Sequence, residues 1–152
     1  FGVLWGAPAG AQLQRPRAEV TPVVLTTDVK PGSTVSVLLK VKLPKDMHVQ
    51  GDKPKDPSLI ATSLTIDAPA GVSVEKISYP AATELAQQGR REKLVVFGPE
   101  FEIEARLALA PSIAPGELVV PGRLRYQACN DTMCFAPARA EAQWTLRVAG
   151  EP

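Results

Sequence analysis

Alternation of apolar and polar side chains is the strongest pattern in this chain. Between residues 33 and 44 (STVSVLLKVKLP) the pattern has a period of two, with Leu38 as the exception, and it returns in residues 100–109 (EFEIEARLAL) and 143–148 (QWTLRV). Such a period over six or more residues predicts a β-strand with one buried and one solvated face. The side chains expected to be buried are Val35, Val37, Leu39, Val41, Leu43, Phe101, Ile103, Ala105, Leu107, Leu109, Trp144, Leu146 and Val148.

Shorter apolar runs, divided by turn-forming residues, predict further strands. These runs are residues 20–29, 59–67, 72–78, 94–97 and 118–128, and the turn signals are KPGS, APAG, APSIAPGE and VPGR. Only AATELAQQGRRE (81–92) has a helical composition, but it is short and Gly89 interrupts it, so we expect a loop with at most one or two helical turns. About eight or nine short strands with regular turn signals predict an all-β fold, an antiparallel β-sandwich.

Length and charge exclude several function classes. The chain has 152 residues, the length of one domain, and such a chain can bury a core without help from a disulfide. With 17 basic and 16 acidic residues its net charge is +1, which offers no basic surface for nucleic acid or for an anionic membrane. There is no motif for a nucleophilic triad or a phosphate-binding glycine loop. We therefore expect no nucleic-acid partner and no small-molecule substrate.

The first eleven residues, FGVLWGAPAGA, differ from the rest of the chain. They are uncharged and apolar, and they end in Ala9-Gly10-Ala11, with small residues where a signal peptidase requires them. We interpret residues 1–11 as the remnant of a signal peptide and residues 12–152 as a single exported domain. An apolar N-terminus or a first strand is the alternative. No other apolar run approaches the ~20 residues that a membrane span needs. Export would place the cysteines in an oxidising compartment, where disulfides persist.

The two cysteines of the chain, Cys129 and Cys134, lie in one short motif, RYQACNDTMCFAPA. Two thiols alone do not fill a tetrahedral zinc site, and a copper(I) site would need distant help from His48 or from the thioethers of Met47 and Met133. We therefore expect no metal and no other cofactor, with copper(I) as the weaker alternative.

A structural disulfide and a redox pair both remain open for this motif. A disulfide that closes a ring of so few residues stabilises a fold by only about 2 kcal/mol, so its contribution to the stability of the domain is small. A short ring at the end of a strand also keeps both sulfurs close together, so that a partner's thiolate can attack one sulfur and the second can resolve the mixed disulfide. Asp131 between the cysteines disfavours a negative charge on them, which suits a pair that a partner acts upon.

The cysteine motif resembles the signature of the N-terminal domain of the bacterial thiol:disulfide interchange protein DsbD. That signature has Tyr-Gln, a small residue, Cys, a short acidic turn, Cys, an aromatic or aliphatic residue, and Pro close behind. The matching residues are Tyr126, Gln127, Ala128, Cys129, Asp131, Cys134, Phe135 and Pro137. Two upstream stretches, MHVQGDKPKDPSLIATSLTI and VSVEKISYPAATE, resemble the same family in the same order. The resemblance extends over roughly residues 34–148.

The resemblance implies an immunoglobulin-like sandwich in the periplasm, with Cys129 and Cys134 as a reversible, catalytic disulfide. It implies a component of a protein-disulfide reductase that receives electrons from thioredoxin-like redox proteins. These are themselves fed by a membrane electron-transfer domain of the same or a partner chain. Oxidised periplasmic proteins, such as a disulfide isomerase or components of cytochrome c maturation, would be the recipients, and by analogy Cys134 attacks them. The alternative is a non-catalytic exported β-sandwich that binds a partner and whose disulfide is structural.

One loop departs from the family pattern. The family usually shields the disulfide with an aromatic residue after Tyr-Pro, whereas ELAQQGRREKLVV contains no Phe or Tyr before Phe97. We expect the shield to be absent, or to be built from an arginine stem and Leu85. Aromatic residues at strand ends usually belong to a core, but those flanking the cysteines can also pack on the disulfide. The supporting residues expected around the pair are Tyr126, Asp131, Phe135, Arg90 and Arg91.

Overall fold

All regular elements in the part of the chain that the structure describes are β-strands. The computed structural model describes residues 2 and 16–150. The strands are β1 (Glu19–Val24), β2 (Thr34–Lys42), β3 (His48–Gln50), β4 (Ser63–Ile66), β5 (Val72–Ser78), β6 (Thr83–Leu85), β7 (Leu94–Phe97), β8 (Glu100–Leu109), β9 (Gly116–Tyr126), β10 (Ala128–Cys129) and β11 (Ala138–Val148). The described residues include no helix that is long and apolar enough to cross a membrane. Apart from residue 2, the segment interpreted as a signal remnant, 1–11, lies outside the described residues.

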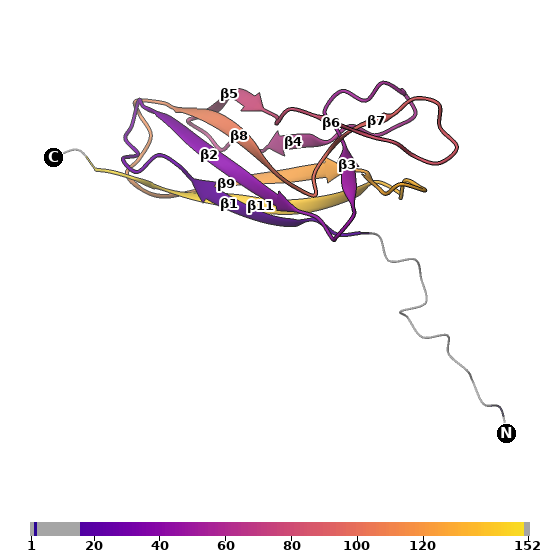
Figure 1. Ribbon diagram of the computed structural model, residues 1–152. Coiled ribbons are helices and arrows are strands. Elements are labelled where there is room, and N and C mark those ends of the chain that lie inside the picture. The colour runs from indigo at the N-terminus through magenta and orange to yellow at the C-terminus, as the bar shows by residue number, and fades with distance from the viewer. Residues whose placement is uncertain (1, 3–15, 151–152) are drawn as a thin grey trace.

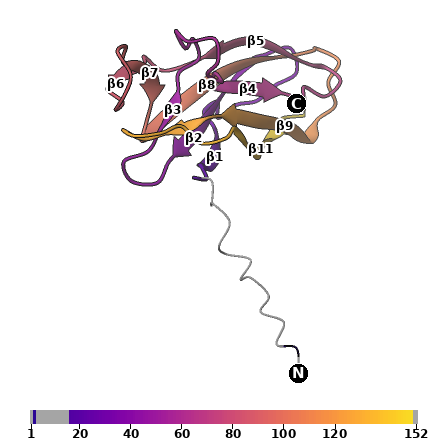
Figure 2. The same ribbon diagram turned by 90° about the vertical axis from the view of Figure 1, so that its right-hand side faces the viewer.

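The strands form three antiparallel sheets, two of which face each other. The first has the order β1-β2-β8-β5 and the second the order β11-β9-β4, and Figure 1 shows them as two layers. The third sheet, β10-β3-β7-β6, lies at one end of these layers, as Figures 1 and 2 show. This arrangement confirms the all-β, immunoglobulin-like sandwich predicted from the sequence.

The core lies between the two layers and consists of the apolar faces predicted from the alternation. On β2 the side chains from Val35 to Val41 that were expected to be buried are at most 2% exposed, and those of β8 that were expected to be buried are at most 8% exposed. Trp144 on β11 is 1% exposed, and its Nε1 donates a hydrogen bond of 3.0 Å to the carbonyl of Leu38 on β2. This bond joins the two layers and satisfies the one polar atom of the largest buried side chain.

The VPGR signal is not a turn, because its residues lie inside β9. Gly122 is required there by close packing: a Cβ at this position would lie 2.9 Å from Cζ3 of Trp144 and 3.3 Å from the carbonyl oxygen of Thr65. Glycine within a strand often marks such an approach rather than a turn. The sequence alone does not distinguish a Pro-Gly pair in a turn from one inside a strand, because the difference lies in the neighbouring strands.

Other boundaries also differ from the sequence-based expectation. The strand expected over residues 20–29 ends at Val24, and the strand expected over 59–67 begins at Ser63. Segment 81–92 contains the short strand β6 and then a hydrogen-bonded turn, in which Arg90 N donates to the carbonyl of Gln87. The expected loop is present without a helical turn, and the strand β6 was not expected in this segment. A three-residue strand is too short to show a period, so its pairing with β7 decides its conformation.

Candidate functional site

The two cysteines form a disulfide in the loop between β9 and β11. Cys129 lies in β10, which pairs with β3 and places Cys129 opposite His48. Cys134 returns beside Cys129 as an isolated antiparallel bridge, with a Cα–Cα distance of 4.0 Å, and the two sulfurs are bonded. Just outside the ring, Phe135 N donates to the carbonyl of Ala128 at 2.8 Å. The disulfide therefore closes a tight local hairpin.

Asn130 explains how the four residues between the cysteines turn. Its Oδ1 accepts hydrogen bonds of 2.9 Å from the backbone N of Thr132, the hydroxyl of Thr132 and the backbone N of Met133. Such a side chain imitates a backbone turn, which is why asparagine is frequent at these positions. Asp131 is exposed at the tip of this turn, and its carbonyl accepts a hydrogen bond of 2.8 Å from Gln88 N. The tip thereby contacts the loop between β6 and β7.

The two cysteines differ in their exposure. Cys129 is 0% exposed and belongs to a small apolar cluster with Leu94 and Val96, whereas Cys134 is partly exposed at the edge of that cluster. Leu59 and Leu85 are partly buried against the same cluster. A thiolate that arrives from solvent can therefore approach the disulfide on the side of Cys134 and not on that of Cys129.

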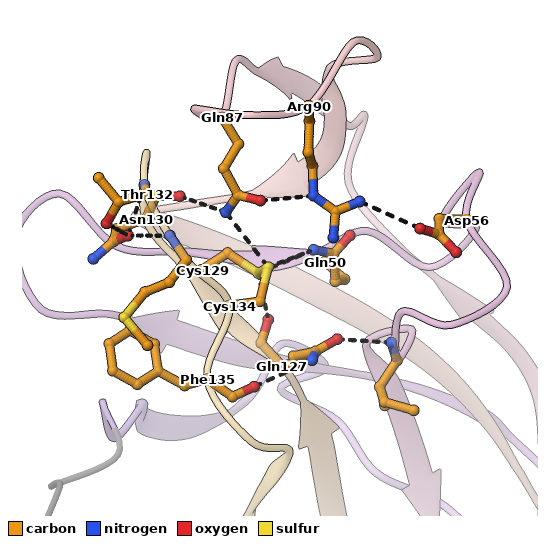
Figure 3. The surroundings of a disulfide bond; sticks show 12 residues. Gln50, Asp56, Gln87, Arg90, Gln127, Cys129, Asn130, Thr132, Cys134 and Phe135 are labelled. Atoms are coloured by element: carbon orange, nitrogen blue, oxygen red, sulfur yellow. Dashed lines mark hydrogen bonds and ion pairs between the residues drawn. A yellow bond between two sulfur atoms is a disulfide. The ribbon is translucent and has the colours of Figure 1, made fainter.

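Two glutamine amides point at the sulfurs, as Figure 3 shows. Nε2 of Gln50, on β3, lies 3.0 Å from Sγ of Cys129 and 3.7 Å from Sγ of Cys134. Nε2 of Gln87, in the loop after β6, lies 3.6 Å from Sγ of Cys134. Both side chains are buried, with exposed fractions of 0% and 7%. Sequence reasoning missed both residues, because no local pattern reveals contacts over such long sequence separations.

Arg90 reaches the disulfide through Gln87. Nε2 of Gln87 donates to the carbonyl of Asn130 at 2.9 Å, while its Oε1 accepts from Nε of Arg90 at 2.8 Å. Nη1 of Arg90 lies 3.3 Å from Oδ2 of Asp56 (Figure 3). The pKa of the Asp56 carboxyl is lowered by hydrogen bonds from the backbone N and the hydroxyl of Ser58, and further by Arg90. The arginine thereby fixes which end of the Gln87 amide faces the sulfur.

Gln127 ties the disulfide loop to the rest of the third sheet. Its Oε1 accepts a hydrogen bond of 2.8 Å from Ile60 N, and its Nε2 donates to the carbonyl of Phe135 at 3.1 Å. Its own carbonyl accepts from Gln50 N at 3.0 Å. A glutamine at this place holds three segments together, which gives a physical reason for the Tyr-Gln pair in the motif.

The aromatic residues that flank the pair pack into the main core. Tyr126 is 2% exposed, and its hydroxyl accepts a hydrogen bond of 3.0 Å from Ala18 N, just before β1. Phe135 is partly buried against the same core. Their packing anchors both ends of the cysteine loop. Among the described residues, no group of three or more His, Cys, Asp or Glu side chains could hold a metal ion.

A pocket of about 250 Å³ opens beside the disulfide. Its lining includes Gln50, Leu59, Arg90, Arg91 and Leu94, so it extends from the buried amide at the sulfurs to two exposed arginines. This places Arg91 at the pocket wall. Gln50 links this pocket to the disulfide, because its Nε2 lies 3.0 Å from Sγ of Cys129.

Comparison with known proteins identifies a family and solved structures with a similar fold. The family model described as "Thiol:disulfide interchange protein DsbD, N-terminal" matches residues 15–145. The fold is similar to the crystal structure of the N-terminal periplasmic domain of ScsB from Proteus mirabilis, with a TM-score of 0.52 and 16% sequence identity, over 86% of this chain and 46% of that chain. The chain thus spans about half the length of that domain, and at this identity the likeness concerns the fold alone. No curated protein matches the chain.

Proposed function

The chain belongs to the family of the N-terminal domain of the thiol:disulfide interchange protein DsbD, and from this premise we propose that its Cys129–Cys134 disulfide is reduced and re-formed in exchange with other proteins. The observation that carries the proposal is the difference in exposure between the two cysteines. Cys134 is partly exposed, and Cys129, to which it is bonded, is fully buried. This arrangement lets a partner attack at one side only, while the second sulfur stays close enough to resolve the mixed disulfide.

In the proposed reaction, a thiolate of a reduced thioredoxin-like donor attacks Sγ of Cys134. A bond forms between the donor and Cys134, the Cys129–Cys134 bond breaks, and the electron pair leaves on Sγ of Cys129, which takes up a proton. The donor's second thiolate then attacks the donor sulfur of the mixed disulfide and releases Cys134, so that two electrons have moved and the donor is left as a disulfide. In the second half of the cycle, Cys134 attacks an oxidised recipient and Cys129 resolves that mixed disulfide.

The proposal places the domain in the periplasm. There it takes electrons from thioredoxin-like redox proteins, supplied by a membrane electron-transfer domain of the same or a partner chain. Oxidised exported proteins, including a disulfide isomerase or components of cytochrome c maturation, are the proposed recipients. Family membership supports thiol-redox partners in general. The oxidising environment of that compartment explains why a steady supply of electrons is needed there.

A purely structural role fits the surroundings of the bond less well. The disulfide joins residues only five apart in sequence, and a ring of that size stabilises a fold by about 2 kcal/mol. The strands on either side, β9 and β11, are each 11 residues long and pair along their whole length without it. The sandwich therefore has little need of this bond.

Trapping with a thioredoxin-like donor tests the proposal. The oxidised protein is mixed with reduced thioredoxin, quenched with a maleimide and analysed by mass spectrometry, and we expect two labelled thiols. In the reverse direction, reduced Cys129→Ser mixed with the oxidised donor should accumulate a mixed disulfide between the donor and Cys134, because Cys134 attacks the donor's disulfide and no Cys129 is present to resolve the product. The matched variant Cys134→Ser, whose remaining thiol is buried, should not. A pair that stays oxidised under excess donor, with a reduction potential below about −300 mV, would reject exchange and leave a binding domain with a structural disulfide.

A further inference from the structure

Gln50 is a polar side chain held in a fully buried place. It is 0% exposed, and its backbone is fixed on both sides: its N donates to the carbonyl of Gln127, and its carbonyl accepts from the hydroxyl of Thr62. The side chain therefore starts from a rigid position and points at the disulfide (Figure 3). Burial of an amide is unfavourable unless both of its ends find partners, so this residue needs an explanation.

Only one end of the Gln50 amide has a partner in the oxidised protein. A disulfide sulfur can accept a hydrogen bond but has no hydrogen to donate, so the NH₂ group must face it. Nε2 accordingly lies 3.0 Å from Sγ of Cys129. Oε1 is buried and has no hydrogen-bond partner among the residues that the structure describes. The oxidised state thus leaves a buried acceptor unsatisfied, which proteins rarely tolerate.

Reduction supplies what this amide lacks. A thiolate is a stronger acceptor for Nε2–H than a neutral disulfide sulfur is, and once the pair is protonated, rotation of the amide lets Oε1 accept the S–H of a thiol. We propose that Gln50 selectively stabilises the reduced pair, and that it stabilises the charge that develops on Cys129 when the disulfide opens. This inference rests on the proposed exchange function and assigns a role in it to a residue outside the cysteine motif.

The surroundings of Cys129 explain why such a group is needed. When a donor thiolate bonds to Cys134, the electron pair of the broken bond moves onto Sγ of Cys129. That sulfur lies in the apolar cluster with Leu94 and Val96, where a negative charge is costly. The Nε2–H group of Gln50 already points at this atom, so it stabilises the leaving thiolate without rearrangement. Gln50 therefore acts on both the rate and the equilibrium of reduction.

Gln50→Met tests the proposal, because methionine has a similar length but neither an amide donor nor a carbonyl acceptor. The matched control is Gln143→Met, at an exposed position on β11. Each protein is equilibrated in glutathione buffers of stepped composition, alkylated and weighed by mass spectrometry. One hydrogen bond to a charged or thiol partner corresponds to about a tenfold change in the equilibrium constant for reduction, and Gln50→Met should lower it by that factor. The rate of reduction by dithiothreitol should fall by about tenfold as well.

A Gln50→Met equilibrium constant within about twofold of the control would overturn the proposal. Thermal unfolding of the oxidised and reduced forms distinguishes the proposed role of Gln50 from a contribution to packing. Lost packing would lower the stability of both forms equally, whereas the proposal requires a larger loss of stability in the reduced form. If Gln50→Met does not fold, NMR of the unaltered protein tests the proposal instead, by comparing its side-chain amide resonances before and after reduction. Those of Gln50 should shift on reduction while those of Gln143 stay, and equal responses would refute the role.

The glutathione assay needs no protein partner, so its outcome is independent of the trapping experiment. A tenfold shift in a protein that no thioredoxin-like donor reduces would retain the role of Gln50 and reject the exchange function. If the protein exchanges with the donor but Gln50→Met behaves like its control, the exchange function would be retained and the role of Gln50 would be rejected.

Discussion

Gln87→Ala should open the disulfide to small thiols. The amide of Gln87 is 7% exposed, and it joins the loop between β6 and β7 to the cysteine loop by donating to the carbonyl of Asn130 at 2.9 Å. It also accepts a hydrogen bond of 2.8 Å from Arg90, which is paired with Asp56. Because Gln87 lies against Sγ of Cys134, the partly exposed cysteine, this loop covers the point of attack.

The structure gives the size of the effect. Each of these two hydrogen bonds contributes about 1 kcal/mol net, so their loss shifts the closed loop toward open states by about 2 kcal/mol, or about thirtyfold. The bond from Gln88 N to the carbonyl of Asp131 and the packing of Leu85 remain, so the loop is loosened rather than released. We expect reduction to accelerate by about tenfold to thirtyfold.

The assay follows reduction of the oxidised protein by dithiothreitol at neutral pH, with quenching by a maleimide and mass spectrometry. Gln88→Ala is the matched control, because Gln88 is exposed and its contact with Asp131 uses only the backbone. Its rate should stay that of the unaltered protein. Equal or slower reduction of Gln87→Ala, with an unchanged melting temperature, would refute the covering role and would show that Gln87 assists the reaction at the sulfur instead.

Three further predictions concern stability and pH. Gly122→Ala should destabilise the fold by about 1–3 kcal/mol in chemical denaturation, because the new Cβ would lie 2.9 Å from the ring of Trp144; an unchanged stability would contradict the packing described. Asp56 has a lowered pKa, so the stability that it adds to its loop persists above the ordinary carboxyl pKa and is lost as pH falls through the lowered value; a carboxyl NMR titration with an unshifted midpoint would disprove this. Arg139→Glu should stabilise the protein by about 0.2–1 kcal/mol in thermal unfolding, because Arg139 lies directly opposite the like-charged Arg125, and a loss of stability would count against it.

The sequence predicted the long strands well, because their periodicity is itself the result of the two-layer packing. The apolar positions of β2 and β8 alternate over nine and ten residues, and every second side chain meets the opposite layer. The strands β3, β6 and β10 have two or three residues each, which is too few to carry a period. These short strands form because neighbouring strands have unpaired hydrogen-bonding edges. The position of such an edge cannot be read from a local stretch of sequence.

The cysteine pair was predictable and its surroundings were not. Cys129 and Cys134 are close in sequence, and their motif carries the family resemblance that the family model confirms. Gln50 and Gln87 are separated from the sulfurs by 79 and 47 residues, and a glutamine in a loop or a short strand is ordinarily taken as a solvated side chain. Arg90 was expected beside the sulfurs, and the structure places it one residue further out, on Asp56 and Gln87. Only the packed third sheet makes these contacts visible.

The attachment of the cysteine loop has a consequence for how such domains diversify. Residues 127–137 hang from two strands whose ladder is complete beneath them, with Ala138 facing Tyr126 as its last rung. The pairing of β9 with β11 uses no residue between those two positions. The sequence of the cysteine loop can therefore change during evolution while the pairing of the two long strands that carry it stays the same.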